Sequence, residues 1–279
     1  MNRTANGDTQ IGKSCFEVDR AAAEMVPFAG GIAAVFCGRC PGKETVCEDS
    51  AALIPFGHHS GVVVVADGLG GQPAGDQASS LAVRRIEESV ATSAETGWEL
   101  RDAILNGFEA ANQSVSQLLA GAATTLAVVE IRGRTVRPYH VGDSMILVVG
   151  QRGKIKLQTV SHSPVGYAVE AGFLDQDEAM HHEERHLISN MIGAADMHIT
   201  IGSTISLADC DTLLVASDGL SDNLHVHEII ECIRSGPLER VSRQLRDETL
   251  QRMTAPMAGH PSKPDDLSFV LFRLVPPLV

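Results

Sequence analysis

An α+β fold is predicted from the way strand-like and helix-like segments alternate along this sequence of 279 residues. Apolar runs of strand length are followed by longer stretches whose apolar residues recur at helical spacing. Two strand-like runs, residues 50–56 and 61–66, are separated by a short turn, which predicts an antiparallel hairpin. The sequence shows no internal repeat and no linker, so we expect one domain over residues 28–279, after a flexible or loosely packed arm at 1–27.

The other elements follow from the same patterns. Strands are expected at residues 30–37, 50–56, 61–66, 122–131, 135–141, 145–150, 212–216 and 267–274. Amphipathic helices are expected at residues 74–90, 101–119, 226–234 and 239–253. Residues 161–197 are mixed and polar, and we expect only helical pieces there.

Composition limits the classes of function. Hydrophobic residues make up 44% of the chain, enough for a sizeable core, whereas aromatic residues make up only 4%. The formal net charge is −13 and no run of basic residues occurs, which argues against nucleic acid and against an anionic membrane surface. The N-terminus lacks the pattern of a signal peptide, and no apolar run approaches the length of a bilayer span. We expect a soluble, cytoplasmic monomer.

The chain is organised around residues 61–71, Gly-Val-Val-Val-Val-Ala-Asp-Gly-Leu-Gly-Gly. The continuous apolar run predicts a strand buried on both faces, because a half-exposed strand would alternate apolar and polar residues. Asp67 follows this strand directly and enters a turn rich in glycine, which allows close approach of the backbone to a bound group. Such a carboxylate suits a metal ion or a catalytic water. The simpler alternative is a core strand followed by a tight turn.

Carboxylates stand at four further strand ends. They are Glu48 with Asp49, Asp143, Asp218 with Asp222, and Asp265 with Asp266. If these groups converge without interleaved Lys or Arg, they repel one another unless cations neutralise them. Oxygen ligands alone indicate Mg²⁺ or Mn²⁺ rather than Zn²⁺. Two such ions about 4 Å apart, sharing a carboxylate, would activate a water for in-line attack on phosphorus.

Six motifs together resemble the type 2C, metal-dependent protein serine/threonine phosphatases (the PPM family) of the bacterial type. The central one is Val-Ala-Asp-Gly-Leu-Gly-Gly at 65–71. The others, in family order, are Glu-Asp-Ser at 48–50, Ala-Thr-Thr-Leu at 123–126, Val-Gly-Asp-Ser at 141–144, Leu-Val-Ala-Ser-Asp-Gly-Leu at 214–220 and Asp-Asp-Leu-Ser at 265–268. The resemblance extends over residues 30–274.

The resemblance implies a four-layer α-β-β-α sandwich of two antiparallel sheets flanked by helices. It also implies hydrolysis of phosphoserine and phosphothreonine in proteins phosphorylated by a Ser/Thr kinase. The nucleophile would be a water or hydroxide that bridges two Mn²⁺ or Mg²⁺ ions, with no covalent phosphoenzyme.

The resemblance further assigns the metal ligands. Asp67 would bridge two ions, and the Gly68 carbonyl would bind one of them. Asp218 and Asp265 would complete one shell, and Glu48 or Asp49 would serve the other ion. Catalysis would therefore rest chiefly on Asp67, Asp49 and Asp218. Positions that hold a weaker third ion are matched by Asp143 and Asp222.

The phosphate-binding position departs from the family pattern. Glu44 stands where the family usually has an arginine that clamps the phosphate. Lys43 beside it, or Arg39 further back, could supply a positive charge instead, but Lys43 cannot do so bidentately. A carboxylate facing a phosphate weakens its binding. An alternative is therefore a catalytically weak or inactive phosphatase-fold module with a regulatory or binding role.

Two further patterns resemble metal sites. Residues 182–186 match His-Glu-x-x-His of zinc proteases, but Ser189 and Ile192 stand where a third-ligand pattern requires glycine and histidine. We therefore expect a surface helix with two solvated histidines. Residues 37–40 form a single Cys-x-x-Cys with no second pair, which favours reduced, partly buried thiols over a zinc or redox site.

Overall fold

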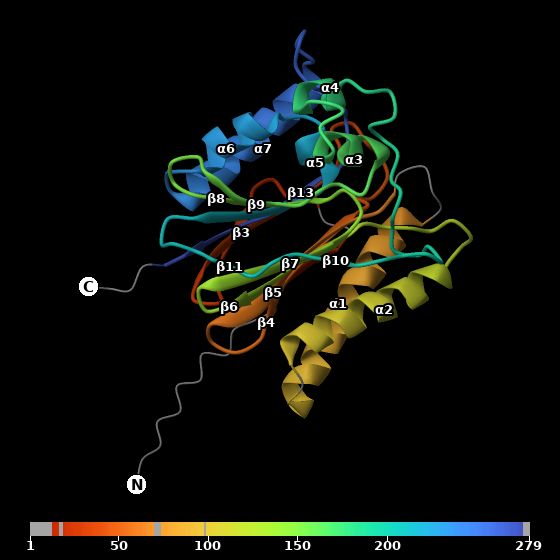
Figure 1. Cartoon of the computed structure of the whole chain (residues 1–279), viewed down its shortest axis with the longest axis vertical. Helices are drawn as coiled ribbons and strands as arrows, with labels where there is room; N and C mark the ends of the chain where they lie inside the picture. Colours follow the sequence, from red (N-terminus) through yellow and green to blue (C-terminus); the bar gives the residue numbers. More distant parts are fainter. Residues whose placement is uncertain (1–12, 17–18, 70–73, 98, 276–279) are drawn as a thin grey trace.

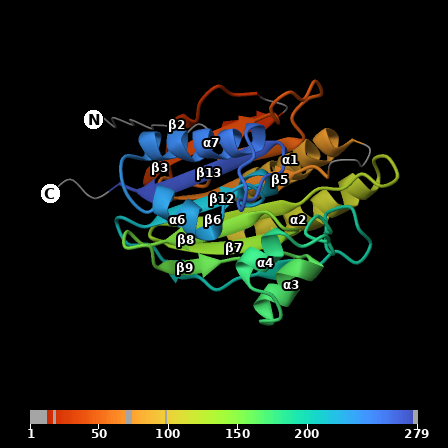
Figure 2. The same ribbon diagram turned by 90° about the horizontal axis from the view of Figure 1, so that it is seen from above.

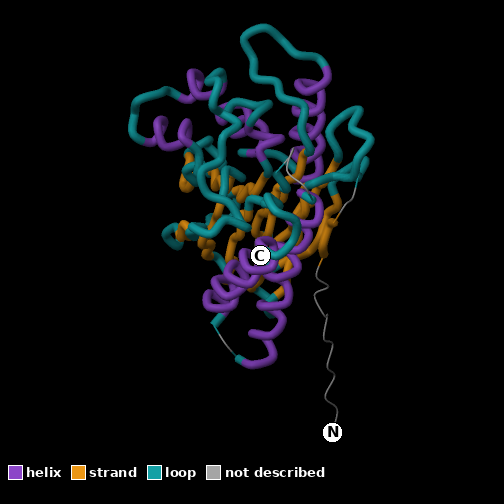
Figure 3. Tube along the Cα trace, turned by 90° about the vertical axis from the view of Figure 1, so that its right-hand side faces the viewer, coloured by secondary structure: helices purple, strands orange, loops and turns teal. Residues whose placement is uncertain are grey.

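The structure, a computed structural model, describes residues 13–16, 19–69, 74–97 and 99–275. Two antiparallel sheets lie face to face, and helices cover the outer face of each (Figure 1). In Figure 3 the strands accordingly occupy the centre of the molecule, with helices around them. This architecture confirms the predicted α+β fold and the four-layer sandwich. Among the described residues, no helix combines the length and the apolar composition needed to cross a bilayer.

Each sheet is a continuous series of hydrogen-bonded strands. The first sheet has the order β1 (Lys13–Phe16), β4 (Asp49–Pro55), β5 (Ser60–Asp67), β6 (Leu126–Arg132), β7 (Thr135–Val141) and β10 (Thr200–Ile201), and β11 (Ile205–Ser206) also pairs with β7. The second sheet has the order β2 (Glu24–Phe28), β3 (Gly31–Gly38), β13 (Leu267–Leu274), β12 (Thr212–Ala216), β8 (Met145–Val149) and β9 (Ile155–Gln158).

Four long helices form the two outer layers. α1 (Gly75–Thr96) and α2 (Leu100–Ser116) pack on the first sheet. α6 (Val226–Ile233) and α7 (Leu238–Thr254) pack on the second sheet and lie over its strands in Figure 2. The shorter helices are α3 (Pro164–Glu170), α4 (Gln176–Met180) and α5 (Asp218–Ser221), which Figure 1 shows near one another. The four long helices confirm the predicted amphipathic segments.

The central valine strand is buried on both faces, as predicted. Val63 and Val65 lie in the apolar layer between the two sheets, together with Phe272 of β13. Val62 and Val64 point the other way and pack with the apolar residues of α1 and α2. Because successive side chains of a strand alternate between faces, only a continuous apolar run can fill both layers.

The N-terminal segment differs from the expectation of a loose arm. Lys13–Phe16 and Glu24–Phe28 are strands, one at an edge of each sheet. Both strands pair with a neighbour, and Cys15 of β1 is buried between the sheets. These residues are therefore not a loose arm, whereas residues 1–12 and 17–18 lie outside the described residues. The domain boundary at residue 28 stays a prediction.

Two other local predictions are wrong. Residues 182–186 form turns rather than a surface helix, and the Glu184 amide donates to Nδ1 of His182 at 3.1 Å. The strand predicted from residue 122 begins only at Leu126. The preceding Thr124 instead makes isolated bridges to Gly68 and Ile192, and so ties the end of the central strand to a distant loop. Gly70 and Gly71 of the central motif lie outside the described residues.

Candidate metal centre

Asp67 is held rigidly at the end of β5. Its amide donates to Oγ1 of Thr125 at 3.0 Å, and its carbonyl accepts from the Thr125 amide at 2.8 Å. Oγ1 of Thr124 donates to the same carbonyl at 2.7 Å. Across the β4–β5 ladder Asp67 is paired with Asp49, as the predicted hairpin requires. The main chain thus fixes the position from which the Asp67 carboxylate projects.

The second sheet brings further carboxylates to the same end of the sandwich. Asp218 follows β12, and its amide lies 3.4 Å from Oδ2 of Asp67. Ser217 donates through Oγ to Oδ2 of Asp49 at 2.8 Å. Asp265 precedes β13, the neighbour of β12. The two sheets therefore meet at an acidic cluster.

The electrostatics of this cluster favour bound cations. Burial raises the pKa of the Asp67 carboxyl well above its usual range, and neighbouring carboxylates, first those of Asp49 and Asp218, raise it further. Burial and the charges of Asp218 and Asp222 raise the pKa of Asp143 to about 8. Oδ1 of Asp143 is also buried with no hydrogen-bond partner among the described residues. An all-oxygen donor set with an unsatisfied buried carboxylate oxygen fits a hard divalent cation.

Gly68 is needed for close packing rather than for an unusual backbone angle. A Cβ at this position would lie 2.2 Å from the Gly75 carbonyl oxygen and 2.7 Å from that of Glu48. The Gly68 amide donates to this Glu48 carbonyl at 3.1 Å. The turn after Asp67 is therefore pressed between two main-chain segments.

Glu48 and Asp49 have different surroundings. Asp49 is buried in the acidic cluster, whereas Glu48 pairs through Oε2 with Nζ of Lys43 at 2.7 Å. Asp266 accepts from Lys43 Nζ at 2.6 Å and from the amides of Cys40 and Glu48, both at 2.7 Å. Asp266 thus anchors the loop before β4.

The candidate phosphate-binding residues are also separated. Lys43 is held beside Glu48, whereas Arg39 donates to Asp19 through Nε at 3.1 Å and through Nη2 at 3.0 Å. Among the contacts found for Arg39 in the described part of the chain, none reaches the acidic cluster. Glu44 is exposed. Lys43 is therefore the better placed of the two basic candidates.

The carboxylates do not converge without an interleaved basic residue, because Lys263 lies among them. Nζ of Lys263 lies 2.8 Å from Oδ2 of Asp218 and 2.8 Å from Oδ2 of Asp222. Oδ2 of Asp265 is 3.1 Å from the same nitrogen. Burial lowers the pKa of this ammonium, but the three carboxylates outweigh burial and raise the pKa above its usual range. Lys263 precedes β13 in a Gly/Pro-rich loop without regular secondary structure. Its place beside the carboxylates could not be predicted from a local sequence pattern.

A groove of about 330 Å³ lies beside the acidic cluster. Asp143, Asp218 and Asp222 line one part of it, and other parts are lined by residues of α3, α4 and α6 and by the loop after β9. The segment predicted as mixed and polar thus supplies a wall of this groove. An open groove next to a cluster of carboxylates gives access to an extended ligand.

The turn that carries Asp143 depends on a neutral histidine. The Gly142 amide donates to Nδ1 of His162 at 3.1 Å, and the His162 amide donates back to the Gly142 carbonyl at 3.0 Å. The His162 ring stacks on His140 with centroids 4.4 Å apart. Burial, followed by the charges of His140 and His198, lowers the pKa of His162 from 6.5 to about 4.

We expect acid to weaken this turn through His162. A histidine whose pKa falls on folding stabilises the protein fully above the unfolded pKa of 6.5, and this contribution is lost as the pH falls through about 4. Chemical denaturation of wild type and His162→Asn, from pH 7 to pH 4, measures the effect. The free energy of unfolding should fall more steeply with acid in wild type; equal slopes would contradict the assignment.

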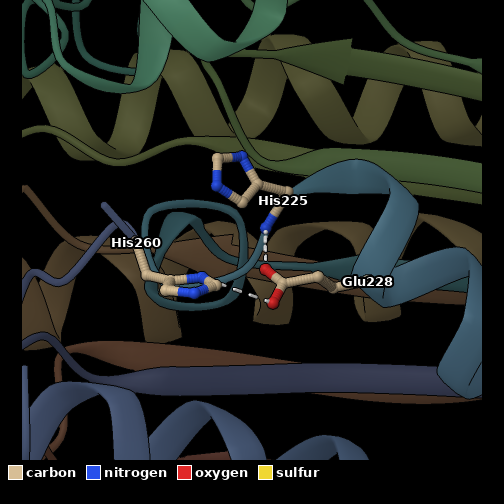
Figure 4. A group of neighbouring side chains, drawn as sticks. All are labelled: His225, Glu228 and His260. Carbon is tan, nitrogen blue, oxygen red and sulfur yellow. Dashed lines mark hydrogen bonds and ion pairs between the residues drawn. The ribbon is translucent and has the colours of Figure 1, made fainter. Parts of the chain in front are cut away.

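A second group of side chains of metal-ligand type is formed by His225, Glu228 and His260 (Figure 4), whose ligand atoms all lie within 4.8 Å of one another. His225 also lines the groove beside the acidic cluster. However, Glu228 already accepts from the His225 amide at 2.8 Å and from Nη2 of Arg252 at 2.9 Å. A cation here would compete with the Arg252 guanidinium, so we interpret Glu228 as a cap of α6.

Comparison with known proteins identifies the family. Residues 39–258 match the family model described as Protein phosphatase 2C. The chain belongs to this family. The protein phosphatase PhpP of Streptococcus pneumoniae is 34% identical over 181 residues, which cover 62% of this chain and 73% of that protein. The family resemblance inferred from the six motifs is therefore confirmed.

Solved structures of the family share the fold. The serine/threonine phosphatase of S. agalactiae superposes with a TM-score of 0.73 at 28% identity, over 87% of this chain and 98% of that one. The catalytic domain of PstP, solved in complex with 2 manganese ions, has a TM-score of 0.67 at 23% identity and covers 88% of this chain and 98% of that one. The relatives found by sequence and by structure are named protein or serine/threonine phosphatases, which are hydrolases.

Proposed function

We propose that the protein is a metal-dependent phosphatase that removes phosphate from phosphoserine and phosphothreonine in proteins. The observation that carries this proposal is the convergence of Asp49, Asp67, Asp143, Asp218 and Asp265 from both sheets at one buried site. Family membership and the names of its relatives as protein phosphatases support it. The substrates would be products of a Ser/Thr kinase.

The carboxylates would hold two Mn²⁺ or Mg²⁺ ions. Asp67 is central because the charges of Asp49, in its own sheet, and of Asp218, beside the other sheet, both raise the pKa of its carboxyl. The ions supply Lewis acidity, which lowers the pKa of water and neutralises charge on the phosphoryl group. The chain itself contributes the rigid Asp67 turn, the Ser217 hydroxyl that orients Asp49, and the groove in which a peptide segment could lie.

Hydrolysis of a phosphothreonine peptide and of p-nitrophenyl phosphate, with and without Mn²⁺, tests the proposal. We expect Mn²⁺-dependent turnover that Asp218→Asn abolishes, because this substitution removes a carboxylate next to Asp67. Mn²⁺ binding without turnover on either substrate would instead favour the alternative, a phosphatase-fold module with a binding or regulatory role. Exposed Asp196→Asn is the matched control and should retain wild-type turnover.

Lys43 is proposed to contact the phosphate. Within the described part of the chain, two of its three ammonium hydrogens serve Glu48 and Asp266, which leaves one donor for a phosphoryl oxygen. Lys43→Met should raise KM for the phosphopeptide about tenfold, the effect of losing one hydrogen bond to a charged group. Arg39→Met should leave KM unchanged, because Arg39 is paired with Asp19. An unchanged KM in Lys43→Met, in a variant with normal thermal stability, would contradict this role.

A further inference from the structure

Lys263 is a basic side chain placed directly among three of the expected metal ligands. Its ammonium has three hydrogens, and three different carboxylates, those of Asp218, Asp222 and Asp265, lie within 2.8–3.1 Å of its nitrogen. Each hydrogen can therefore be matched to one acceptor. Asp143 and Asp222 are the two residues expected to hold a third ion. Lys263 therefore already pairs with one of these two ligands, Asp222.

The position of Lys263 is fixed by the main chain as well as by its charge. The Lys263 amide donates to Oδ1 of Asn223 at 2.8 Å, and the Lys263 carbonyl accepts from Nδ2 of the same residue at 2.8 Å. Asn223 is fully buried, and its Nδ2 also donates to the Gly219 carbonyl at 2.9 Å. Both peptide groups of Lys263 are thus tied to the segment that carries Asp218 and Asp222.

Repulsion also disfavours a third divalent ion beside this ammonium. An ion held by Asp143 and Asp222 would share the Asp222 carboxylate with Lys263, whose nitrogen lies 2.8 Å from Oδ2 of that residue. Repulsion between two cations on one carboxylate in a partly buried site is weakly screened.

We propose that the ε-ammonium of Lys263 takes the place of the third cation, so that the protein binds two divalent ions and not three. The inference rests on the proposed function, because it concerns the same metal centre. Lys263 acts as a positioning residue: its ammonium pairs with Oδ2 of Asp222, of Asp218 and of Asp265, and engaging Asp222 leaves Asp143 without a partner ligand for an ion. A lysine here therefore sets the metal stoichiometry of the site.

The number of Mn²⁺ ions bound per chain tests this assignment without reference to turnover. Isothermal titration calorimetry, together with metal analysis after equilibrium dialysis at a fixed free Mn²⁺ concentration, should give two ions for wild type. Lys263→Met should give three, because Asp143 and Asp222 are then free to share an ion. Adding Asp222→Asn to Lys263→Met should return the count to two.

Control variants distinguish the loss of the Lys263 charge from a general disruption of the structure. Lys263→Arg keeps the positive charge and should bind two ions, and exposed Lys154→Met should also bind two. The proposal is overturned if wild type binds three ions, if Lys263→Met binds the same number as wild type, or if Lys263→Arg gains an ion. Lys263→Gln repeats the measurement should the methionine variant fail to fold.

The same samples distinguish this inference from the proposed function. A gain of one ion in Lys263→Met with no turnover of phosphopeptide in any variant would contradict the phosphatase proposal alone. Turnover with an unchanged ion count would contradict the role of Lys263 alone.

Discussion

Asp67→Asn is expected to lower Mn²⁺-dependent turnover by about 1,000-fold and, in the absence of metal, to make the protein more stable. Activity falls because Asp67 lies close enough to Asp49 of one sheet and Asp218 of the other for their charges to raise its pKa, and so stands where the metal ligands of both sheets meet. Stability rises because burial and neighbouring charges raise the pKa of this carboxyl, so its ionised form opposes folding at pH 8. An amide of the same shape removes that charge.

Two measurements check both halves of this prediction. Turnover on p-nitrophenyl phosphate with Mn²⁺ gives the activity, and thermal unfolding in EDTA at pH 8 gives the stability, with a Tm a few degrees above wild type. Exposed Asp196→Asn should change neither quantity. Residual activity above a tenth of wild type, or a lower Tm without metal, would show that Asp67 is not the central carboxylate of the site.

Opposite effects on activity and stability are expected wherever a fold holds like charges together for function. In this protein the strain is electrostatic. Burial comes first in raising the pKa of Asp49, Asp67 and Asp143. Neighbouring carboxylates raise these pKa values further: Asp266 and Asp265 act on Asp49, Asp49 and Asp218 on Asp67, and Asp218 and Asp222 on Asp143. Cations at the site relieve this repulsion, and Lys263 relieves part of it permanently on the side of Asp218 and Asp222.

Local pattern was enough to predict most of the fold. The valine strand, the hairpin with β4 and the four long helices each depend on residues close together in sequence, whose apolar spacing decides which side chains are buried. The short strands β9, β10 and β11 were not predicted. β10 and β11 have two residues each and are held mainly by pairing with β7, which no local pattern reveals.

In the candidate site, too, residues at strand ends could be predicted from the sequence, whereas residues placed by loop contacts could not. Asp67, Asp143 and Asp218 could be predicted because each stands at a strand end, which local apolar pattern locates: Asp67 is the last residue of β5, and a single residue separates Asp143 from β7 and Asp218 from β12. Lys263 and Ser217 could not, since their roles depend on which loops meet in space. The sequence also left Glu48 and Asp49 as alternatives, whereas the structure buries Asp49 in the cluster and pairs Glu48 with Lys43.

Gly68→Ala is expected to destabilise the protein by about 1–3 kcal/mol and to weaken Mn²⁺ binding, although it changes no charge. The added methyl group would lie 2.2 Å from the Gly75 carbonyl oxygen and 2.7 Å from the Glu48 carbonyl oxygen, and neither main-chain atom can move independently of its element. The turn must therefore shift, and the Asp67 carboxylate moves with it.

Thermal unfolding in EDTA and Mn²⁺ titration test this second prediction, with Gly150→Ala as the matched control. At Gly150 the nearest heavy atom to an added Cβ is 3.5 Å away, an ordinary contact, so stability and Mn²⁺ affinity should stay near wild type. Wild-type Mn²⁺ affinity in Gly68→Ala would show that the turn tolerates displacement. Without metal, Gly68→Ala should lower the Tm and Asp67→Asn should raise it. The sign of the change in Tm therefore distinguishes a displaced turn from the removal of a buried charge at the same turn.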